Sequence, residues 1–126
     1  MSLPPLLQEH IKFLEDEGHK IEVTVNSEIH IVFKDYKISD NIWNRNSTDI
    51  LVITHPTYPN AKMDMFWVDP PISLKSGKVA QAANTTENKI GKNWQRFSWH
   101  VPTWNPAHDN LITYLNVVDD RLKRDE

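Results

Sequence analysis

The sequence predicts an α+β fold with an N-terminal helix, a four-stranded antiparallel meander, a long loop and a C-terminal helix. Apolar residues recur at helical spacing at both ends of the chain, and they alternate with polar residues in short runs between those ends. Two of these runs are separated by a short turn, which is typical of an antiparallel hairpin. Hairpin-linked strands followed by a helix favour a sheet covered on one face. Because there is no internal repeat or linker, residues 1–126 are predicted to form one domain.

The first helix is predicted over residues 4–17. Its apolar residues follow helical spacing, and charged residues fall between them. Proline is tolerated in a first helical turn, and Gly18 is a suitable C-terminal cap because glycine readily adopts the left-handed conformation that ends many helices. The leucines that we expect to be buried in this helix are Leu6, Leu7 and Leu14.

Four strands are predicted between the helices, over residues 21–25, 29–33, 49–54 and 63–68. The first two alternate with period two and flank a short turn, which predicts a hairpin. The third is almost continuously apolar, as expected for a strand in the middle of a covered sheet. Between the second and third strands, Trp43 and its apolar neighbours Ile38 and Ile42 are expected to fold back onto the core.

Residues 72–93 are polar and show no period, which predicts a long irregular connection of the kind that is usually functional or disordered. The segment 94–106 follows it and contains three tryptophans. Pro102 and Pro106 make a regular helix unfavourable there, because proline lacks an amide donor and clashes with the preceding turn. We expect this segment to be held by aromatic burial rather than by backbone ladders.

The last helix is predicted to begin after Asp109, whose carboxylate is a suitable N-cap for the backbone amides of a first turn. Apolar residues follow at helical spacing as far as the charged end of the chain. Those that we expect to be buried are Leu111, Leu115 and Val118.

Composition excludes several classes of protein. The net charge is −3, with 39% hydrophobic and 25% charged residues, which is the balance of a globular domain and does not favour nucleic-acid binding. Because no apolar run could span a bilayer and no signal peptide opens the chain, we expect a cytoplasmic protein that does not bind membranes. The chain has no cysteine, which excludes disulfides, thiolate metal sites and cysteine nucleophiles.

A series of short motifs spans nearly the whole chain, and no single one is diagnostic. In order they are Phe13-Leu14 with Gly18, Tyr58-Pro59, Asp64-Met65, Asp69-Pro70-Pro71, Gly91, Trp94-Gln95-Arg96, Ser98, His100, Trp104, Asp109-Asn110-Leu111 and Tyr114-Leu115. Together their order and spacing resemble the ubiquitin-conjugating-enzyme fold, and more closely the prokaryotic ubiquitin-conjugating-enzyme-like family E. The resemblance implies the conjugating component of a bacterial ubiquitin-like modification pathway. Its implied partners are a ubiquitin-like protein and an activating-enzyme-like protein.

The chain departs from the conjugating-enzyme pattern at its reactive residue. The family's thioester cysteine would lie in the loop ahead of Trp104, and the His-Pro-Asn motif upstream of it. Here no cysteine exists, and His55-Pro56 lies in a different loop. Two hypotheses remain. The protein is a conjugating enzyme that uses a hydroxyl and forms an oxyester, or it is a non-catalytic adaptor of the same fold.

Ser98 and His100 are the candidate catalytic pair. In an extended segment, residues two positions apart project to the same side, so the imidazole could act as a base toward the hydroxyl. The alternative is that Ser98 bonds the backbone and His100 packs between tryptophans. Other hydroxyl groups are candidates for the same role, namely those of Thr103, Thr85 and Thr86.

Further residues are candidates for partner binding, since tryptophan, tyrosine and arginine are favoured interface anchors. They are Tyr58, Trp94, Arg96, Trp99, Trp104 and Asp109. The tryptophans could equally close the core, and Asp109 could serve only as a helix cap. His100, His108 and Asp109 show no compact metal-ligand spacing, and the three glycines form no phosphate loop, so we predict neither a metal nor a cofactor.

Overall fold

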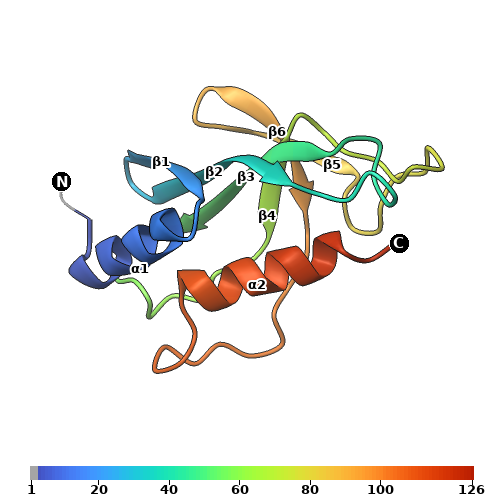
Figure 1. The fold of residues 1–126 in the computed structure, drawn as a ribbon. Coiled ribbons are helices and arrows are strands. Elements are labelled where there is room, and N and C mark those ends of the chain that lie inside the picture. The colour runs from blue at the N-terminus through green and yellow to red at the C-terminus, as the bar shows by residue number, and fades with distance from the viewer. Residues whose placement is uncertain (1–2) are drawn as a thin grey trace.

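The computed structural model describes residues 3–126, which form two helices and one antiparallel sheet (Figure 1). Helix α1 spans Pro5–Asp16 and helix α2 spans Leu111–Leu122. The strands are β1 (Lys20–Val25), β2 (Ile29–Lys37), β3 (Ser47–Thr54), β4 (Phe66–Asp69), β5 (Thr85–Lys89) and β6 (Lys92–Phe97). They lie in the order β1-β2-β3-β4-β6-β5. The predicted α+β class is confirmed, as are the helix before the strands and the helix after them.

The predicted number of strands is wrong, because the sheet has six strands rather than four. Strands β5 and β6 form a hairpin within the stretch predicted to be irregular. Its two-residue turn, Ile90-Gly91, has φ values of 44° and 84°, which suits the primed turns that join twisted strands. Strand β6 also pairs with β4. Residues 94–97 are therefore held by backbone ladders as well as by burial, contrary to the prediction.

Two strand boundaries differ from the prediction for local backbone reasons. The fourth strand begins at Phe66 rather than at residue 63, because Met65 has a φ of 62° and leaves the extended conformation. Strand β2 continues beyond Phe33 through a bulge, where Asp35 has a φ of 51°. The backbone N–H of Asp35 donates to the Asp49 carboxylate at 2.9 Å, so a side chain satisfies the amide that the bulge frees.

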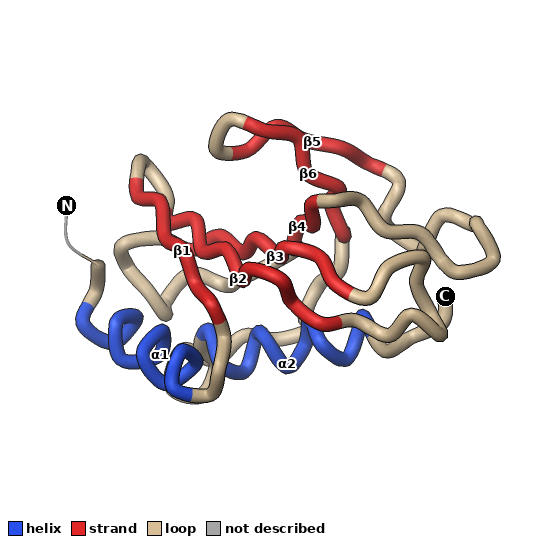
Figure 2. Tube along the Cα trace, turned by 45° about the horizontal axis from the view of Figure 1, so that its top comes forward, coloured by secondary structure: helices blue, strands red, loops and turns tan. Residues whose placement is uncertain are grey.

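Both helices lie against the same face of the sheet and enclose the main core (Figures 1 and 2). The predicted burial is confirmed for Leu7, Leu14, Leu111, Leu115 and Val118. The prediction for Leu6 is wrong, since this side chain is 40% exposed. Consecutive helical residues point about 100° apart, so α1 can direct only one of its adjacent leucines fully toward the sheet.

The polar ends of buried aromatic side chains attach α2 to the rest of the fold. Trp43, predicted to fold back onto the core, is fully buried, and its indole N–H donates to the Leu122 carbonyl at 2.7 Å. The Tyr36 hydroxyl donates to Asp119 at 3.0 Å. In the opposite direction, the Tyr114 hydroxyl of α2 donates to a carbonyl in the loop before β4. These bonds satisfy groups that would otherwise be costly to bury.

A second, smaller core lies on the face of the sheet opposite the helices. Its buried members are Val32, Leu51, Trp67 and Trp94. The β5–β6 hairpin lies on this side of the sheet in Figure 2. Lysine side chains close the cluster, since the Lys89 ammonium lies 5.4 Å from the centre of the Trp67 ring and the Lys92 ammonium 4.4 Å from that of Trp94. Such contacts combine cation–π attraction with coverage by the apolar lysine stems.

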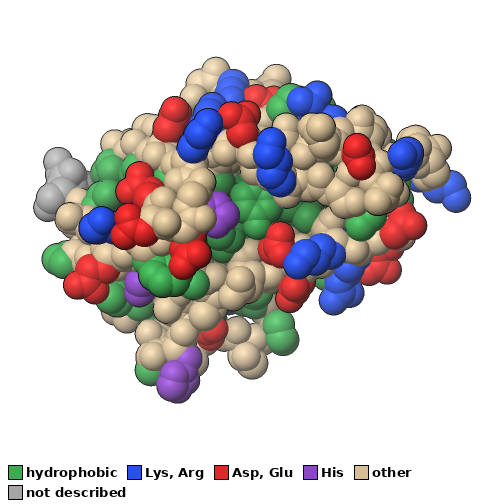
Figure 3. All heavy atoms as spheres, in the orientation of Figure 1, with side chains coloured by type: hydrophobic (Ala, Val, Ile, Leu, Met, Phe, Trp, Pro, Cys, Tyr) green, Lys and Arg blue, Asp and Glu red, His purple; other side chains and the backbone are tan. Residues whose placement is uncertain are grey.

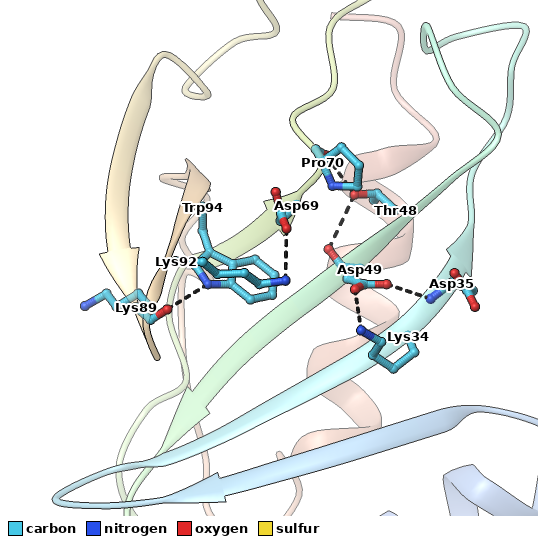
Figure 4. Close-up of polar contacts among 9 residues, drawn as sticks. All are labelled: Lys34, Asp35, Thr48, Asp49, Asp69, Pro70, Lys89, Lys92 and Trp94. Atoms are coloured by element: carbon cyan, nitrogen blue, oxygen red, sulfur yellow. Dashed lines mark hydrogen bonds and ion pairs between the residues drawn. The ribbon is translucent and has the colours of Figure 1, made fainter.

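Ion pairs cross the same face beside this cluster (Figure 4). Asp49 of β3 and Asp69 of β4 are directly opposite each other in the sheet register. Lys34 pairs with Asp49 at 2.8 Å, and Lys92 pairs with Asp69 at 2.9 Å. Burial acts to raise the pKa of Asp49, but the bonds from Lys34 and from the Asp35 amide outweigh it and lower that pKa. Each carboxylate thus has its own lysine, which offsets the repulsion expected between like charges across strands.

Candidate functional site

The predicted site segment connects β6 to α2 and is joined to the loop of residues 55–65, which precedes β4. The backbone N–H of Met65 donates to the Trp99 carbonyl at 3.3 Å. The indole N–H of Trp104 donates to the Pro59 carbonyl at 2.8 Å. Together these bonds hold two loops that are distant in sequence against each other, and the loop pair is the candidate site.

Tyr58, a predicted binding residue, is only 6% exposed and lies beneath this loop pair. Its hydroxyl oxygen accepts the Leu111 backbone N–H at 2.6 Å and lies 2.6 Å from Nδ1 of His10. This one oxygen therefore contacts both α1 and the first residue of α2. Burial raises the pKa of Tyr58 to about 12, although the Leu111 N–H opposes this rise. The side chain therefore connects α1 to α2 and has little surface for a partner.

Burial of the His10 imidazole makes stability depend on pH. Burial lowers the pKa of His10 below 6.5, although Glu9 opposes this effect. In the window between the lowered pKa and 6.5, the unfolded chain binds more protons than the folded chain, so the free energy of unfolding decreases as the pH is lowered. The loss is complete once the pH is below the pKa of His10 in the folded protein. We expect His10→Gln to show a smaller acid-induced decrease than the wild type in urea unfolding measured from pH 8 to 5. Identical pH profiles would contradict this account.

Ser98 lies in a polar network at the end of β6. Its Oγ accepts Nε–H of Arg96 at 2.9 Å, and Nη1 of Arg96 pairs with Glu87 at 3.2 Å. Glu87 also accepts the Trp67 indole N–H at 2.8 Å. That bond and the nearby cations lower the pKa of Glu87 despite a partial opposing effect of burial. Arg96 is thus held by a carboxylate and presents a cationic donor to the serine hydroxyl.

His100 pairs with Asp64 rather than with Ser98. Nδ1 of the imidazole lies 2.7 Å from the Asp64 carboxylate, and the side chains are 53% and 34% exposed. An ionised carboxylate only accepts hydrogen bonds, so Nδ1 carries the proton and Nε2 of the neutral ring is the basic nitrogen. Within residues 3–126, no hydrogen bond joins Ser98 to His100. The sequence thus places these two residues close along the chain, but each has a different partner.

The three predicted tryptophans have two different environments. Trp94 is 1% exposed and belongs to the second core. Trp99 and Trp104 are partly buried against the main core. Since both retain some exposure at the loop pair, they remain candidates for partner contact, whereas Trp94 is enclosed.

The predicted cap of α2 is wrong by one residue. Asn110, not Asp109, is the N-cap, and its side chain accepts the N–H groups of Ile112 and Thr113 in a capping box. The Asp109 carboxylate instead accepts the Asn105 backbone N–H at 2.8 Å, so it shapes the loop before the helix. Asp109 therefore also belongs to the candidate site as a residue that supports its backbone.

Sequence reasoning missed several residues of the site. Neither Asp64 nor Glu87 was among the predicted site residues, yet each determines the arrangement of a predicted residue. Their partners are 36 and 9 positions away in sequence, and no local pattern signals such pairs. The strand pairing of β5 with β6 would have indicated Glu87, but β5 itself was not predicted.

Other features of the surface do not point to a second type of site. On the face shown in Figure 3, acidic and basic side chains are interspersed. Among the described residues, no group of three histidine, aspartate or glutamate side chains is placed to hold a metal ion. No helix within residues 3–126 is long and apolar enough to cross a membrane. A cavity of about 530 Å³ between the end of α1 and β2 contains none of the predicted site residues.

An antiparallel sheet with one helix before its strands and one after them, and a loop site before the last helix, is consistent with the class of E2-like proteins. A model of prokaryotic E2 family E matches residues 6–125, and the chain belongs to this family. Membership indicates a role in a ubiquitin-like conjugation pathway, with protein partners. No curated protein and no solved structure matches the chain.

Proposed function

We propose that the protein is a non-catalytic component of a ubiquitin-like conjugation pathway, which binds a ubiquitin-like protein or an activating enzyme. The observation that carries this proposal is the absence of cysteine from a chain of the E2 family. A thioester requires a thiol, so the chain cannot form one. The hydrogen bonds at the loop pair also support a binding role, because Ser98 is bonded to Arg96 and His100 to Asp64.

The proposed binding surface is the exposed part of the loop pair. It combines partly exposed Trp99 and Trp104 with the exposed pair of His100 and Asp64. Loops fixed on a rigid scaffold commonly carry binding residues, and tryptophans surrounded by polar groups are typical interface anchors. Tyr58 and Asp109 support this surface from below or beside it rather than contacting a partner, and Trp94 lies outside it in the second core.

A second candidate function is transfer through an oxyester on Ser98. The specific observation in its favour is the Arg96 Nε–H bond, because a cationic donor stabilises the alkoxide over the hydroxyl. In this step Ser98 Oγ attacks the carbonyl of a thioester on the activating enzyme, the C–S bond breaks and a thiolate leaves, which then takes the serine proton from the protonated imidazole. The hydroxyl proton passes to His100 Nε2, which requires the imidazole to approach Ser98. Thr103, Thr85 and Thr86 are alternative acceptors of the acyl group.

One reconstitution distinguishes the two functions. The protein is mixed with its activating enzyme and the processed ubiquitin-like protein. Amide chemical shifts report binding, and electrophoresis reports covalent adducts. If the binding function is correct, shifts concentrate at the loop pair, Trp104→Ala weakens binding, and no adduct forms. Trp94→Phe is the matched control, since it changes an enclosed tryptophan outside the surface and should leave affinity unchanged.

An oxyester has a distinct chemical signature in the same experiment. It resists thiol reductant but is cleaved by strong base, and the adduct should disappear in Ser98→Ala and persist in Thr103→Ala. Such an adduct would replace the binding proposal with the catalytic one. Shifts confined to the hairpin side of the sheet, with Trp104→Ala binding normally, would contradict the proposed surface. Absence of both binding and adduct would contradict both functions.

A further inference from the structure

The residue that precedes β4, Met65, has an unusual backbone conformation that is held from several sides. Its φ of 62° lies in the left-handed region, which is uncommon for residues with a large side chain. Its N–H donates to the Trp99 carbonyl at 3.3 Å, its carbonyl accepts the Tyr114 hydroxyl, and its side chain packs against the second core. Such a conformation persists only where the surrounding structure fixes it. Met65 is therefore a fixed point between the sheet, α2 and the site segment.

Tyr114 supplies the contact from α2. Its side chain is 1% exposed, and its hydroxyl donates to the Met65 carbonyl. Burial raises the pKa of Tyr114, and the charge of Asp64 acts in the same direction, so the hydroxyl keeps its proton and remains a donor. The Trp104 ring packs against the same tyrosine edge to face, with the ring centres 6.5 Å apart. One residue of α2 therefore contacts both loops of the candidate site.

The backbone turn at Met65 brings the Asp64 carboxylate to the imidazole of His100. Asp64 directly precedes Met65, and His100 directly follows Trp99, whose carbonyl accepts the Met65 amide, so two bonds join the same two short segments. The carboxylate accepts from Nδ1 at 2.7 Å, which leaves a lone pair on Nε2 of the neutral ring. The His100 side chain is 53% exposed, and within residues 3–126 its Nε2 makes no hydrogen bond.

We propose that Tyr114 is a positioning residue of the binding surface. By holding Met65 it keeps Asp64 against His100, and this makes Nε2 of His100 a hydrogen-bond acceptor that the surface offers to a partner. The partner group that fits it is an N–H or O–H donor. An acceptor whose tautomer and orientation are fixed before binding favours affinity, because less conformational freedom is lost when the complex forms.

The two parts of this inference depend on different observations. The positioning of His100 by Tyr114 rests only on the contacts of Met65 and Asp64. The use of Nε2 toward a ubiquitin-like protein rests on the proposed function. The first part can therefore be tested on the free protein, and the second part needs the partner.

The tautomer of His100 tests the positioning without any partner. Long-range ¹H–¹⁵N correlation spectra of the intact protein, recorded at pH 8.5 to observe the neutral ring, distinguish a proton on Nδ1 from a proton on Nε2. We expect the Nδ1–H form in the wild type. Tyr114→Phe leaves the Met65 carbonyl without its donor, so in this variant the ring should become a mixture of tautomers and the Met65 amide should exchange faster with solvent.

Tyr36→Phe is the matched control, because it removes the same atom from another tyrosine that bonds across the interface with α2. The Tyr36 hydroxyl donates to Asp119 at 3.0 Å, outside the loop pair. This variant should lose stability but keep the Nδ1–H form of His100. An unchanged tautomer in Tyr114→Phe, an altered one in Tyr36→Phe, or an Nε2–H form in the wild type would each overturn the positioning role.

Asp64→Asn changes only the last link and serves if Tyr114→Phe fails to fold. The side chain is 34% exposed, and an amide in its place offers Nδ1 a donor, which favours the proton on Nε2. Asp69→Asn is its matched control, since Asp69 pairs with Lys92 on the sheet. Affinity for the ubiquitin-like protein, measured by titration, should fall by about three- to tenfold in Asp64→Asn and Tyr114→Phe, the range for one hydrogen bond. Both controls should bind like the wild type.

Normal affinity in Asp64→Asn despite an altered tautomer would overturn the acceptor role of His100. An equal loss in Asp69→Asn would assign the effect to general charge and would overturn it as well. If the tautomer is unchanged in Tyr114→Phe while the wild type still binds the ubiquitin-like protein at the loop pair, this inference falls and the proposed function stands. If the wild type does not bind that protein, the proposed function fails, and the tautomers alone decide whether Tyr114 positions His100.

Discussion

Replacing Trp94 with alanine is expected to lower the free energy of unfolding by about 3–5 kcal/mol, the range for truncating a large buried aromatic residue. The side chain, on β6, is 1% exposed and packs in the second core with Val32, Leu51 and Trp67. Its indole N–H also donates to the Lys89 carbonyl at 3.0 Å, which holds the hairpin turn. Urea denaturation followed by circular dichroism measures the effect.

Trp94→Phe is the matched control for this prediction, because it keeps a ring in the second core while removing the hydrogen bond. We expect a smaller loss of stability from it than from the alanine variant. An unchanged denaturation midpoint in Trp94→Ala would mean that the hairpin does not pack on the sheet as described. It would also return Trp94 to the set of residues available for partner binding.

Leu115→Ala should cost about 2–5 kcal/mol of unfolding free energy, because it leaves a cavity where α2 packs on the sheet. Leu115 is 6% exposed within the main core. Leu6→Ala provides a matched comparison in the other helix, since the same side chain is removed from a position that is 40% exposed. We expect its effect to stay within about 1 kcal/mol, as is usual outside the core. Thermal and urea unfolding of both variants, measured together, test the pair.

If Leu6→Ala were as damaging as Leu115→Ala, the packing of α1 would differ from that described here. If Leu115→Ala left the thermal midpoint unchanged, the placement of α2 would be wrong. Because both substitutions remove the same atoms from a helix, the difference between them reports burial and not helix propensity.

The sequence predicts the parts of this fold in which apolar periodicity is strong. The helices and the first strand bury mainly one face each, so their residues repeat with the period of the backbone, whereas the third strand is covered on both faces and was recognised by its continuous apolar run. Strand β5 lies at the edge of the sheet and reads Thr-Thr-Glu-Asn-Lys, which contains no buried residue and so no apolar period. The hairpin signal was confined to Ile90-Gly91, whose positive φ angles become evident only in the structure.

The candidate site was predictable as a segment but not as a set of pairs. Aromatic residues and prolines mark the stretch before α2 as unusual in the sequence alone. However, the bond from His100 to Asp64 depends on how two loops are placed by the sheet. The burial of Arg121 among aromatic rings from three parts of the chain likewise depends on the fold, which local spacing does not reveal. The spacing of Ser98 and His100 in the sequence therefore predicted a side-chain pair that the structure does not form.

The bonds between aromatic side chains and α2 also have a consequence for the order of folding during synthesis. Tyr36, Trp43 and Tyr58 are made early, but their hydrogen-bond partners on α2 lie 53 to 83 positions later in the chain. Until residue 122 has left the ribosome, these polar groups and the apolar face of the sheet beneath α2 have no cover. The emerging chain therefore cannot complete its core in stages, and we expect the domain to close only after translation of the last helix.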